Sequence, residues 1–106
     1  MDKEKFARFS VGQRVRHKLF DYRGVVFNVD AVFSSDEQWY EQVAQSRPPK
    51  DAPWYHVLPN GTTHTTYVAE RNLVADTSGE AIHHPLLQNF FDEATDDGYR
   101  SREKFN

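Results

Sequence analysis

The chain has 106 residues, enough for one domain and little more. Cysteine is absent, which excludes a disulfide framework, a thiolate nucleophile and a cysteine-ligated zinc site. The formal net charge of −3 excludes general coating of nucleic acid by a uniformly basic surface.

Charge is distributed unevenly along the chain. Residues 1–24 hold seven Lys or Arg against three acids, whereas residues 76–106 hold seven acids against three Lys or Arg. A local basic surface is therefore compatible with an acidic chain. No apolar run approaches the roughly 20 residues that cross a bilayer, and the N-terminus lacks an apolar signal segment. We therefore expect a cytoplasmic bacterial protein with no membrane partner.

Residues 1–8 are charged and mixed in sign, which predicts an N-terminal arm before a folded domain at 9–75. The first strand is expected between Val11 and Leu19, where apolar and polar residues alternate. The eight Phe, five Tyr and two Trp of the chain favour a small β core.

Because successive side chains of a strand point to opposite faces, three cations of this first strand share one face. They are Arg14, Arg16 and Lys18. Arg23, in the following turn, adds a fourth basic group. Two interpretations remain open. The stripe is either the solvated face of an edge strand, which discourages aggregation, or a surface that binds a polyanion such as DNA.

A second strand is predicted over residues 25–30, and a short helical excursion follows between Ser34 and Ser46. Ser35 is the expected N-cap, and acids suit the helix start. The large aromatic residues of this excursion either join the core or form a surface for self-association. They are Phe33, Trp39 and Tyr40.

Residues 52–58 and 62–68 read as a β-hairpin, since both runs are rich in aromatic and β-branched residues. A three-residue loop at 59–61 suits its Pro-Asn-Gly sequence and makes His56 face His64. A two-residue loop would instead make His56 face Thr65.

Two histidines on adjacent strands could bind a metal ion, but a structural zinc site requires four ligands and no nearby carboxylate completes this set. We therefore expect a hydrogen-bonded pair formed by His56 and His64, with no metal and no cofactor. Two close imidazoles do not both become charged easily, so the hairpin is expected to loosen as the pH falls through the histidine range.

After the hairpin, a turn at 69–72 leads to a last short strand at 73–74. Residues 76–106 are expected to form an acidic C-terminal extension, with a helix at 85–94 opened by Pro85 and a mobile tail from Asp92 onward. The acidic pairs of the chain are sequence neighbours in surface-like segments, where their side chains point apart, so no catalytic site is predicted.

Four segments together resemble the YccV-like hemimethylated-DNA-binding family, which includes bacterial heat-shock proteins of the HspQ kind. They are Phe9-Ser10-Val11-Gly12-Gln13-Arg14-Val15-Arg16-His17, Tyr22-Arg23-Gly24-Val25-Val26, Pro53-Trp54-Tyr55-His56-Val57, and Thr66-Tyr67-Val68-Ala69-Glu70 with Asn72-Leu73. The resemblance implies a mainly β fold, a small SH3-like β-barrel, and a role without enzyme activity.

Two roles follow from the resemblance. The first is binding of double-stranded, hemimethylated DNA. The second is service as an adaptor for a Lon-like ATP-dependent protease and its client proteins. For the DNA role, the basic stripe would contact phosphates while Trp54 or Tyr55 contacts the methyl group, with core packing as the competing interpretation for these two aromatics. A protein-interaction module with an exposed sheet edge, including a homo-oligomer, remains the alternative.

Overall fold

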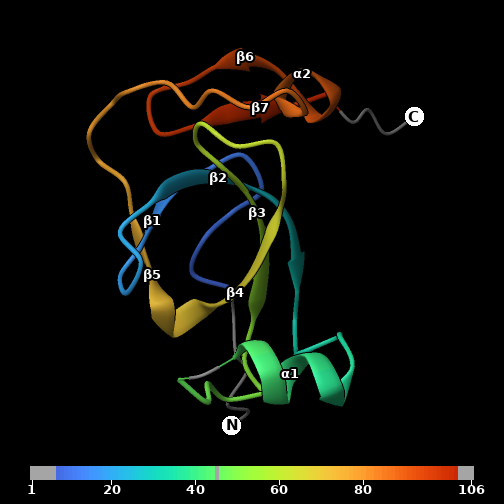
Figure 1. The fold of residues 1–106 in the computed structure, drawn as a ribbon. Coiled ribbons are helices and arrows are strands. Elements are labelled where there is room, and N and C mark those ends of the chain that lie inside the picture. Colours follow the sequence, from blue (N-terminus) through green and yellow to red (C-terminus); the bar gives the residue numbers. More distant parts are fainter. Residues whose placement is uncertain (1–6, 45, 103–106) are drawn as a thin grey trace, which may run out of the picture.

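The computed structural model describes residues 7–44 and 46–102, and in this part of the chain the fold is mainly β, as predicted. The elements in chain order are β1 (Arg14–His17), β2 (Arg23–Asp30), α1 (Glu37–Val43), β3 (Trp54–Pro59), β4 (Thr66–Ala69), the 3₁₀ turn η1 (Glu70–Asn72), β5 (Leu73–Ala75), α2 (Leu87–Phe90), β6 (Phe91–Ala94) and β7 (Tyr99–Ser101). Figure 1 shows α2, β6 and β7 at one end of the molecule and α1 at the opposite end.

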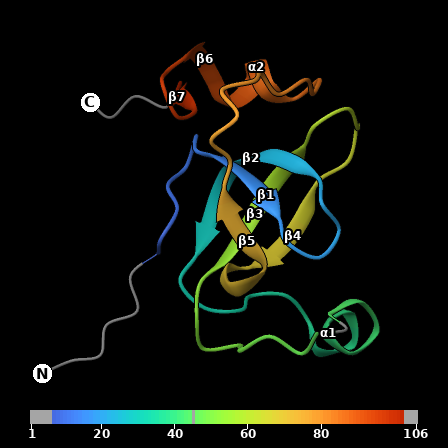
Figure 2. The ribbon, with the colours of Figure 1, turned by 90° about the vertical axis from the view of Figure 1, so that its left-hand side faces the viewer.

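Five strands form one antiparallel sheet in the order β4-β3-β2-β1-β5, and the sheet is strongly curled (Figure 2). A β-bulge at Phe27 interrupts the pairing of β2 with β3, and such bulges bend a strand. The element η1 connects the two edge strands, β4 and β5. Within the described residues no ladder joins these edges, so the sheet is not closed, and the predicted SH3-like barrel is not confirmed.

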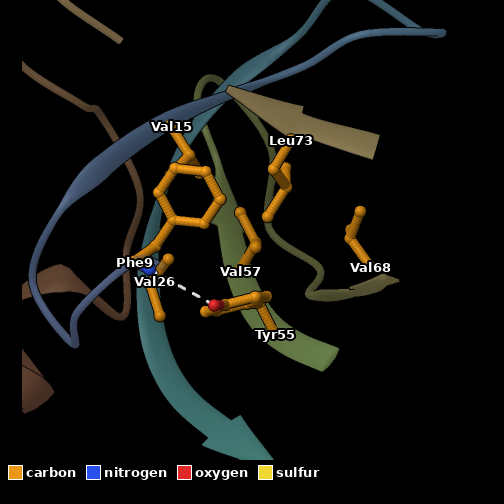
Figure 3. Packing of buried hydrophobic residues seen from close by; sticks show 7 residues of the cluster. All are labelled: Phe9, Val15, Val26, Tyr55, Val57, Val68 and Leu73. Carbon is orange, nitrogen blue, oxygen red and sulfur yellow. Dashed lines mark hydrogen bonds between the residues drawn. The ribbon is translucent and has the colours of Figure 1, made fainter. Parts of the chain in front are cut away.

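The inside of the curled sheet holds the main hydrophobic core. Tyr55 and Val57 of β3 point into it, whereas Trp54 and Leu58 belong to separate clusters on the other side, so the side chains of β3 alternate between the two faces of the sheet. The Tyr55 hydroxyl accepts a hydrogen bond from the Phe9 backbone N–H at 3.2 Å, shown by the dashed line in Figure 3. The cluster comprises Phe9, Val15, Val26, Tyr55, Val57, Val68 and Leu73.

The predicted hairpin is present as β3 and β4, but both predicted registers are wrong. His56 pairs with Tyr67, and Val57 pairs with Thr66, so the connecting loop is longer than three residues. His64 lies exposed in this loop and does not face His56. The predicted histidine pair, and the pH response expected from two close imidazoles, are therefore corrected.

Contacts with the C-terminal segment hold the long loop between β3 and β4. The Asn60 side-chain oxygen accepts from the His83 N–H at 2.7 Å, and the Gly61 N–H donates to the His83 carbonyl at 2.8 Å. The His84 Nε2 donates to the His64 carbonyl at 2.7 Å. These partners satisfy loop groups that a short hairpin would have placed in the ladder, which explains why the strands end early.

The helical excursion is confirmed as α1, with Asp36 rather than Ser35 as its N-cap. The Asp36 carboxylate accepts from the Trp39 N–H at 2.7 Å. Tyr40 is buried and donates from its hydroxyl to the Pro48 carbonyl, while Trp39 remains half-buried. One aromatic cluster thereby joins α1 to the sheet, and its rings belong to Phe33, Trp39, Tyr40, Trp54 and Tyr67.

The C-terminal segment is folded through Arg102, where a mobile tail was expected from Asp92 onward. A helix was predicted over 85–94, but the observed helix α2 covers only Leu87–Phe90. Phe91 already begins the strand β6. Strands β6 and β7 form a hairpin, and Ile82 and Phe91 pack against Val25 and Leu58 in a second core cluster. The other face of the sheet is therefore covered by this segment.

Two glycines allow the C-terminal hairpin to approach the start of β1. Gly12 has φ 95°, and a Cβ built on it would lie 2.1 Å from the Tyr99 carbonyl oxygen. A Cβ on Gly98 would lie 1.9 Å from the Gly12 carbonyl oxygen. The backbones touch at this point, with a hydrogen bond of 2.6 Å from the Tyr99 N–H to the Gly12 carbonyl, so both positions require glycine.

Candidate nucleic-acid interface

The four predicted cations do not form one surface. Arg16 and Lys18 are exposed, and Arg23 is partly buried. Arg14 is only 4% exposed, although it lies two residues before Arg16 and therefore on the same face of β1. The difference arises because the C-terminal hairpin covers the Arg14 end of β1. The alternation of the strand predicted the shared face but not the cover over half of it.

Arg14 is enclosed by the C-terminal hairpin. Its Nη2 donates to the Asp96 carbonyl at 2.8 Å, and its guanidinium lies 5.7 Å from the centroid of the Tyr99 ring. Its backbone N–H donates to the Asp97 carbonyl. Among the described residues its buried Nε has no hydrogen-bond partner. Enclosed in this way, Arg14 cannot reach a DNA phosphate, and its prediction as a DNA-binding residue is wrong for this fold.

Arg23 binds the segment that follows β5. Its Nε donates to the Asp76 carboxylate at 2.8 Å and its Nη2 to the Glu80 carbonyl at 2.5 Å. Burial acts to raise the pKa of Asp76, but hydrogen bonds from Ser78 and Arg23 outweigh it and hold that pKa below its usual range. The guanidinium of Arg23 is thus committed to this internal ion pair, and it is a poor candidate for a phosphate contact.

The two aromatic residues predicted to contact a DNA methyl group are buried. Trp54 is 1% exposed and Tyr55 0% exposed. The Tyr55 hydroxyl donates to Glu70, and burial together with this hydrogen bond raises the pKa of Tyr55 to about 12. Of the two interpretations considered for these residues, the structure supports core packing.

The exposed part of the predicted interface consists of Arg16 on the outer side of β1 and Lys18 directly after this strand. Arg16 pairs with Asp21 at 3.2 Å, and both side chains are well exposed, so water and salt weaken this ion pair. Leu19 and Phe20 follow directly and are 58% and 72% exposed. Leu19 was predicted as the end of the first strand and Phe20 as the start of the following turn, and an apolar side chain in a turn is a signal that could have identified Phe20 as exposed from the sequence.

His17 holds the turn that carries Leu19 and Phe20. Its Nδ1 accepts hydrogen bonds from the Leu19 and Phe20 N–H groups, both at 3.1 Å, and its ring stacks on Phe20 with centroids 4.7 Å apart. Burial lowers the pKa of His17. The neutral imidazole is therefore the form that stabilises this turn, since protonation of Nδ1 removes its acceptor.

An apolar groove of about 700 Å³, hereafter the β4 groove, lies beside the predicted interface. One wall is the turn after β1, with Leu19, Phe20 and Tyr22, and the other is α1, with Trp39 and Val43. In Figure 2, β4 lies at one edge of the curled sheet with α1 below it.

Asp30 connects two side chains that line the β4 groove, His56 and Tyr67. The Tyr67 hydroxyl donates to Asp30 at 2.7 Å, and the His56 Nε2 lies 3.0 Å from the same oxygen. Burial and the Asp30 hydrogen bond raise the pKa of Tyr67 to about 12. His56 is thus paired with a carboxylate from β2, in place of the predicted partner His64.

The residues that the structure describes contain no group of three or more His, Asp or Glu side chains that could hold a metal ion. Within the same residues, no helix has both the length and the apolar character needed to cross a membrane.

Together, the fold and its surfaces define a small, mainly β domain with an exposed basic pair and an adjoining apolar groove. The family model described as "Hemimethylated DNA-binding protein YccV like" matches residues 7–98. The chain therefore belongs to the YccV-like family of hemimethylated DNA-binding proteins, and the match includes most of the C-terminal segment that covers the sheet.

Proposed function

We propose that this protein is a non-enzymatic, SH3-like domain that binds double-stranded DNA with a preference for hemimethylated sites. Membership of the YccV-like family over residues 7–98 is the observation that carries the proposal. The binding surface is the outer side of β1 and the turn that follows it, where Arg16 and Lys18 contact phosphates.

The surroundings of Arg16 support this assignment. Its ion pair with Asp21 joins two exposed side chains, and such a pair contributes little stability. A DNA phosphate can therefore replace Asp21 at small cost. The acidic turn between β6 and β7, which includes Asp96 and Asp97, opposes DNA near Arg14 and directs it toward the Arg16 end of the strand.

The exposed apolar neighbours of Lys18 supply the contact to a methyl group. Leu19 and Phe20 take the role that was predicted for the buried Trp54 and Tyr55. Burial of one methyl group contributes about 0.8 kcal/mol, which corresponds to roughly a fourfold difference in affinity. A stronger preference for hemimethylated DNA would require deformation of the duplex or binding by two copies of the protein.

The test is fluorescence anisotropy with matched unmethylated, hemimethylated and fully methylated duplexes at about 50 mM and about 200 mM salt. Arg16→Ala/Lys18→Ala is expected to weaken binding and to reduce the salt slope by up to about two, one for each lost phosphate contact. Arg102→Ala, a change of an exposed arginine whose backbone N–H donates to the Phe90 carbonyl, serves as the charge control. Equal binding by the double variant and wild type would refute the proposed surface.

The double variant Leu19→Ser/Phe20→Ser tests whether the affinity for DNA depends on methylation of the duplex. Loss of the difference between hemimethylated and unmethylated duplexes, with overall affinity retained, is the expected outcome. A wild-type protein that binds all three duplexes equally would refute the preference while leaving the DNA surface intact.

A second candidate function, an adaptor for an ATP-dependent protease, is favoured by the β4 groove. An exposed apolar groove with Phe20 and Val43 at its rim suits a protein partner better than a phosphate backbone. Co-sedimentation of the purified protein with a Lon-like protease, with and without Val43→Glu, tests this role. Protease binding that is unaffected by Val43→Glu would show that the β4 groove does not mediate this role.

A further inference from the structure

The β4 groove runs along the open edge of a strand and not over the face of a sheet. Residues 65–69 all line it, and in a strand successive side chains point to opposite faces. A groove that reaches every residue in turn must therefore border the strand edge. β4 pairs on its other side with β3 and occupies the end of the sheet order.

The open edge provides hydrogen-bonding groups as well as apolar contacts. In an antiparallel edge strand, every second residue directs its N–H and C=O away from the neighbouring strand. Within the described part of the chain, β4 residues make no backbone hydrogen bonds beyond those of their own ladder. An extended peptide laid along β4 would satisfy these groups and place alternate side chains between the two walls of the groove.

Charge is concentrated at one end of the groove. That end is formed by Ser46 and Asn72, joined by a hydrogen bond of 3.2 Å from the Asn72 side chain. Three exposed cations adjoin it. Lys18 donates from its backbone to the Asn72 carbonyl, Arg71 donates to the Ser46 carbonyl at 2.5 Å, and Arg47 follows Ser46 in the chain.

The cations at this end outnumber the acids. Glu41 pairs with Arg47 at 2.9 Å and neutralises one of the three positive charges. The positive charges of Lys18 and Arg71 remain in excess at this end of the groove. An acidic residue of a bound peptide would therefore be favoured next to Ser46 and Asn72, and a basic one disfavoured.

From these observations we infer that the β4 groove binds an extended peptide of another protein, which adds to β4 as a further strand. The peptide carries apolar side chains at alternate positions and acidic residues at the end that lies near Ser46 and Asn72. This site shares Leu19 and Phe20 with the proposed DNA surface and lies next to Lys18, but its α1 wall, with Trp39 and Val43, contains no residue assigned to DNA.

The experiment probes an array of immobilised synthetic peptides with the purified full chain. The peptides alternate Leu or Val with Thr, and end in two glutamates, two lysines or two serines. A matched set replaces each apolar residue by serine. Binding is expected to be strongest for apolar peptides with glutamates, weaker for those with lysines, and absent for the serine set.

Three changes test the assignment of the site. Val43→Glu, at a residue 53% exposed on α1, should weaken binding of the best peptide about tenfold or more, since it puts a negative charge against the apolar segment. Val32→Glu, at a residue 48% exposed outside the groove, is the matched control and should change nothing. N-methylation of alternate peptide nitrogens should abolish binding if the peptide pairs with β4.

The outcomes are distinct. Equal binding of every peptide by wild type and Val43→Glu, or no binding at all, would overturn the inference. A purified protein that is dimeric, and becomes monomeric on Val43→Glu without binding any peptide, would show that a second copy fills the groove and would also overturn it. DNA binding by Val43→Glu should equal wild type, so failure of the peptide site and failure of the DNA surface are separately visible.

Discussion

The guanidinium of Arg14 lies over the ring of Tyr99, 5.7 Å from its centroid, and joins the first strand of the chain to the last. Cation–π contacts of this kind are stronger where water is excluded, and Arg14 is 4% exposed. The contact makes β7 part of the fold, and it explains why a residue with the sequence pattern of a surface cation is enclosed.

Arg14→Met keeps a long side chain over Tyr99 but removes the buried charge and its hydrogen bond to the Asp96 carbonyl. Replacement of a buried charged group by an apolar one of similar size is often near neutral, so we expect a change within about 1 kcal/mol in the free energy of unfolding. Arg14→Ala also loses the packing and should cost about 2–4 kcal/mol in urea unfolding.

The same variants separate structural from DNA-binding cations. Arg14→Met should leave the salt slope of DNA binding unchanged, whereas Arg16→Met should reduce it by up to about one with little effect on stability. A salt slope that falls equally in both variants would mean that Arg14 leaves its buried position when DNA binds.

Phe91→Ala tests whether the C-terminal segment contributes to the stability of the sheet. Phe91 is 3% exposed and packs with Val25, Leu58 and Ile82, so its truncation should lower the free energy of unfolding by about 3–5 kcal/mol. Phe20→Ala, at a residue 72% exposed, should change it by no more than about 0.5 kcal/mol. Both values come from urea unfolding at one pH. A mobile C-terminal tail would instead make the two substitutions equally mild.

Asp76→Asn is expected to destabilise the protein at neutral pH and not in strong acid. Loss of the Asp76 carboxylate leaves the partly buried Arg23 without its closest negative charge. This change should lower the free energy of unfolding by about 1–3 kcal/mol at pH 7. The pKa of Asp76 is lowered in the fold, so its contribution is present above the ordinary value of 3.8 and is lost as the pH falls through the folded pKa.

The measurement compares urea unfolding of Asp76→Asn and wild type at neutral pH and in acid. Their stabilities should converge once Asp76 is protonated in both the folded and the unfolded state. Glu80→Gln is the control, because Glu80 is 77% exposed and lies 3.9 Å from Arg23, and it should have almost no effect at either pH. A constant difference between Asp76→Asn and wild type at all pH values would contradict this account.

His17 should make the stability depend on pH in the mildly acidic range. Burial lowers its pKa below 6.5, so the unfolded chain takes up a proton before the folded protein does. Stability therefore falls as the pH drops from about 6.5 toward the lower folded pKa, and this contribution then levels off. His17→Asn supplies an amide oxygen that can accept from the Leu19 and Phe20 N–H groups without titrating.

The expected result is a weaker pH dependence of urea unfolding in His17→Asn than in wild type. His83→Asn, a change at an exposed histidine, should keep the wild-type dependence. Identical pH profiles for wild type and both variants would show that His17 does not contribute to the response.

The sequence predicted the elements of the sheet better than their pairing. Turn residues and β-branched runs identified the hairpin, and Gly61 lies in its loop with a positive φ of 79°. The register was wrong because Asn60, Gly61 and His64 bond to His83 and His84, which lie far along the chain. No local signal reveals partners at that separation.

For the candidate site, too, the sequence predicted the local pattern but not the contacts with distant segments. Alternation correctly grouped Arg14 with Arg16, but only the C-terminal hairpin decides which of the two meets solvent. Trp54 and Tyr55 were considered both as core and as surface, and the cover on each side of β3 places them in the core. The β4 groove was not predicted, because its walls come from a turn and a helix that are distant in sequence.

The position of β1 has a consequence for synthesis on the ribosome. β1 is translated early, yet it pairs with β5 and is covered by the turn around Asp97 and Gly98. Nascent chains that end before Phe91 lack its ring against Val25 and Leu58 and leave that apolar surface uncovered. The contacts that cover this surface can therefore form only after Phe91 has been translated, and until then the apolar surface of Val25 and Leu58 lacks its cover.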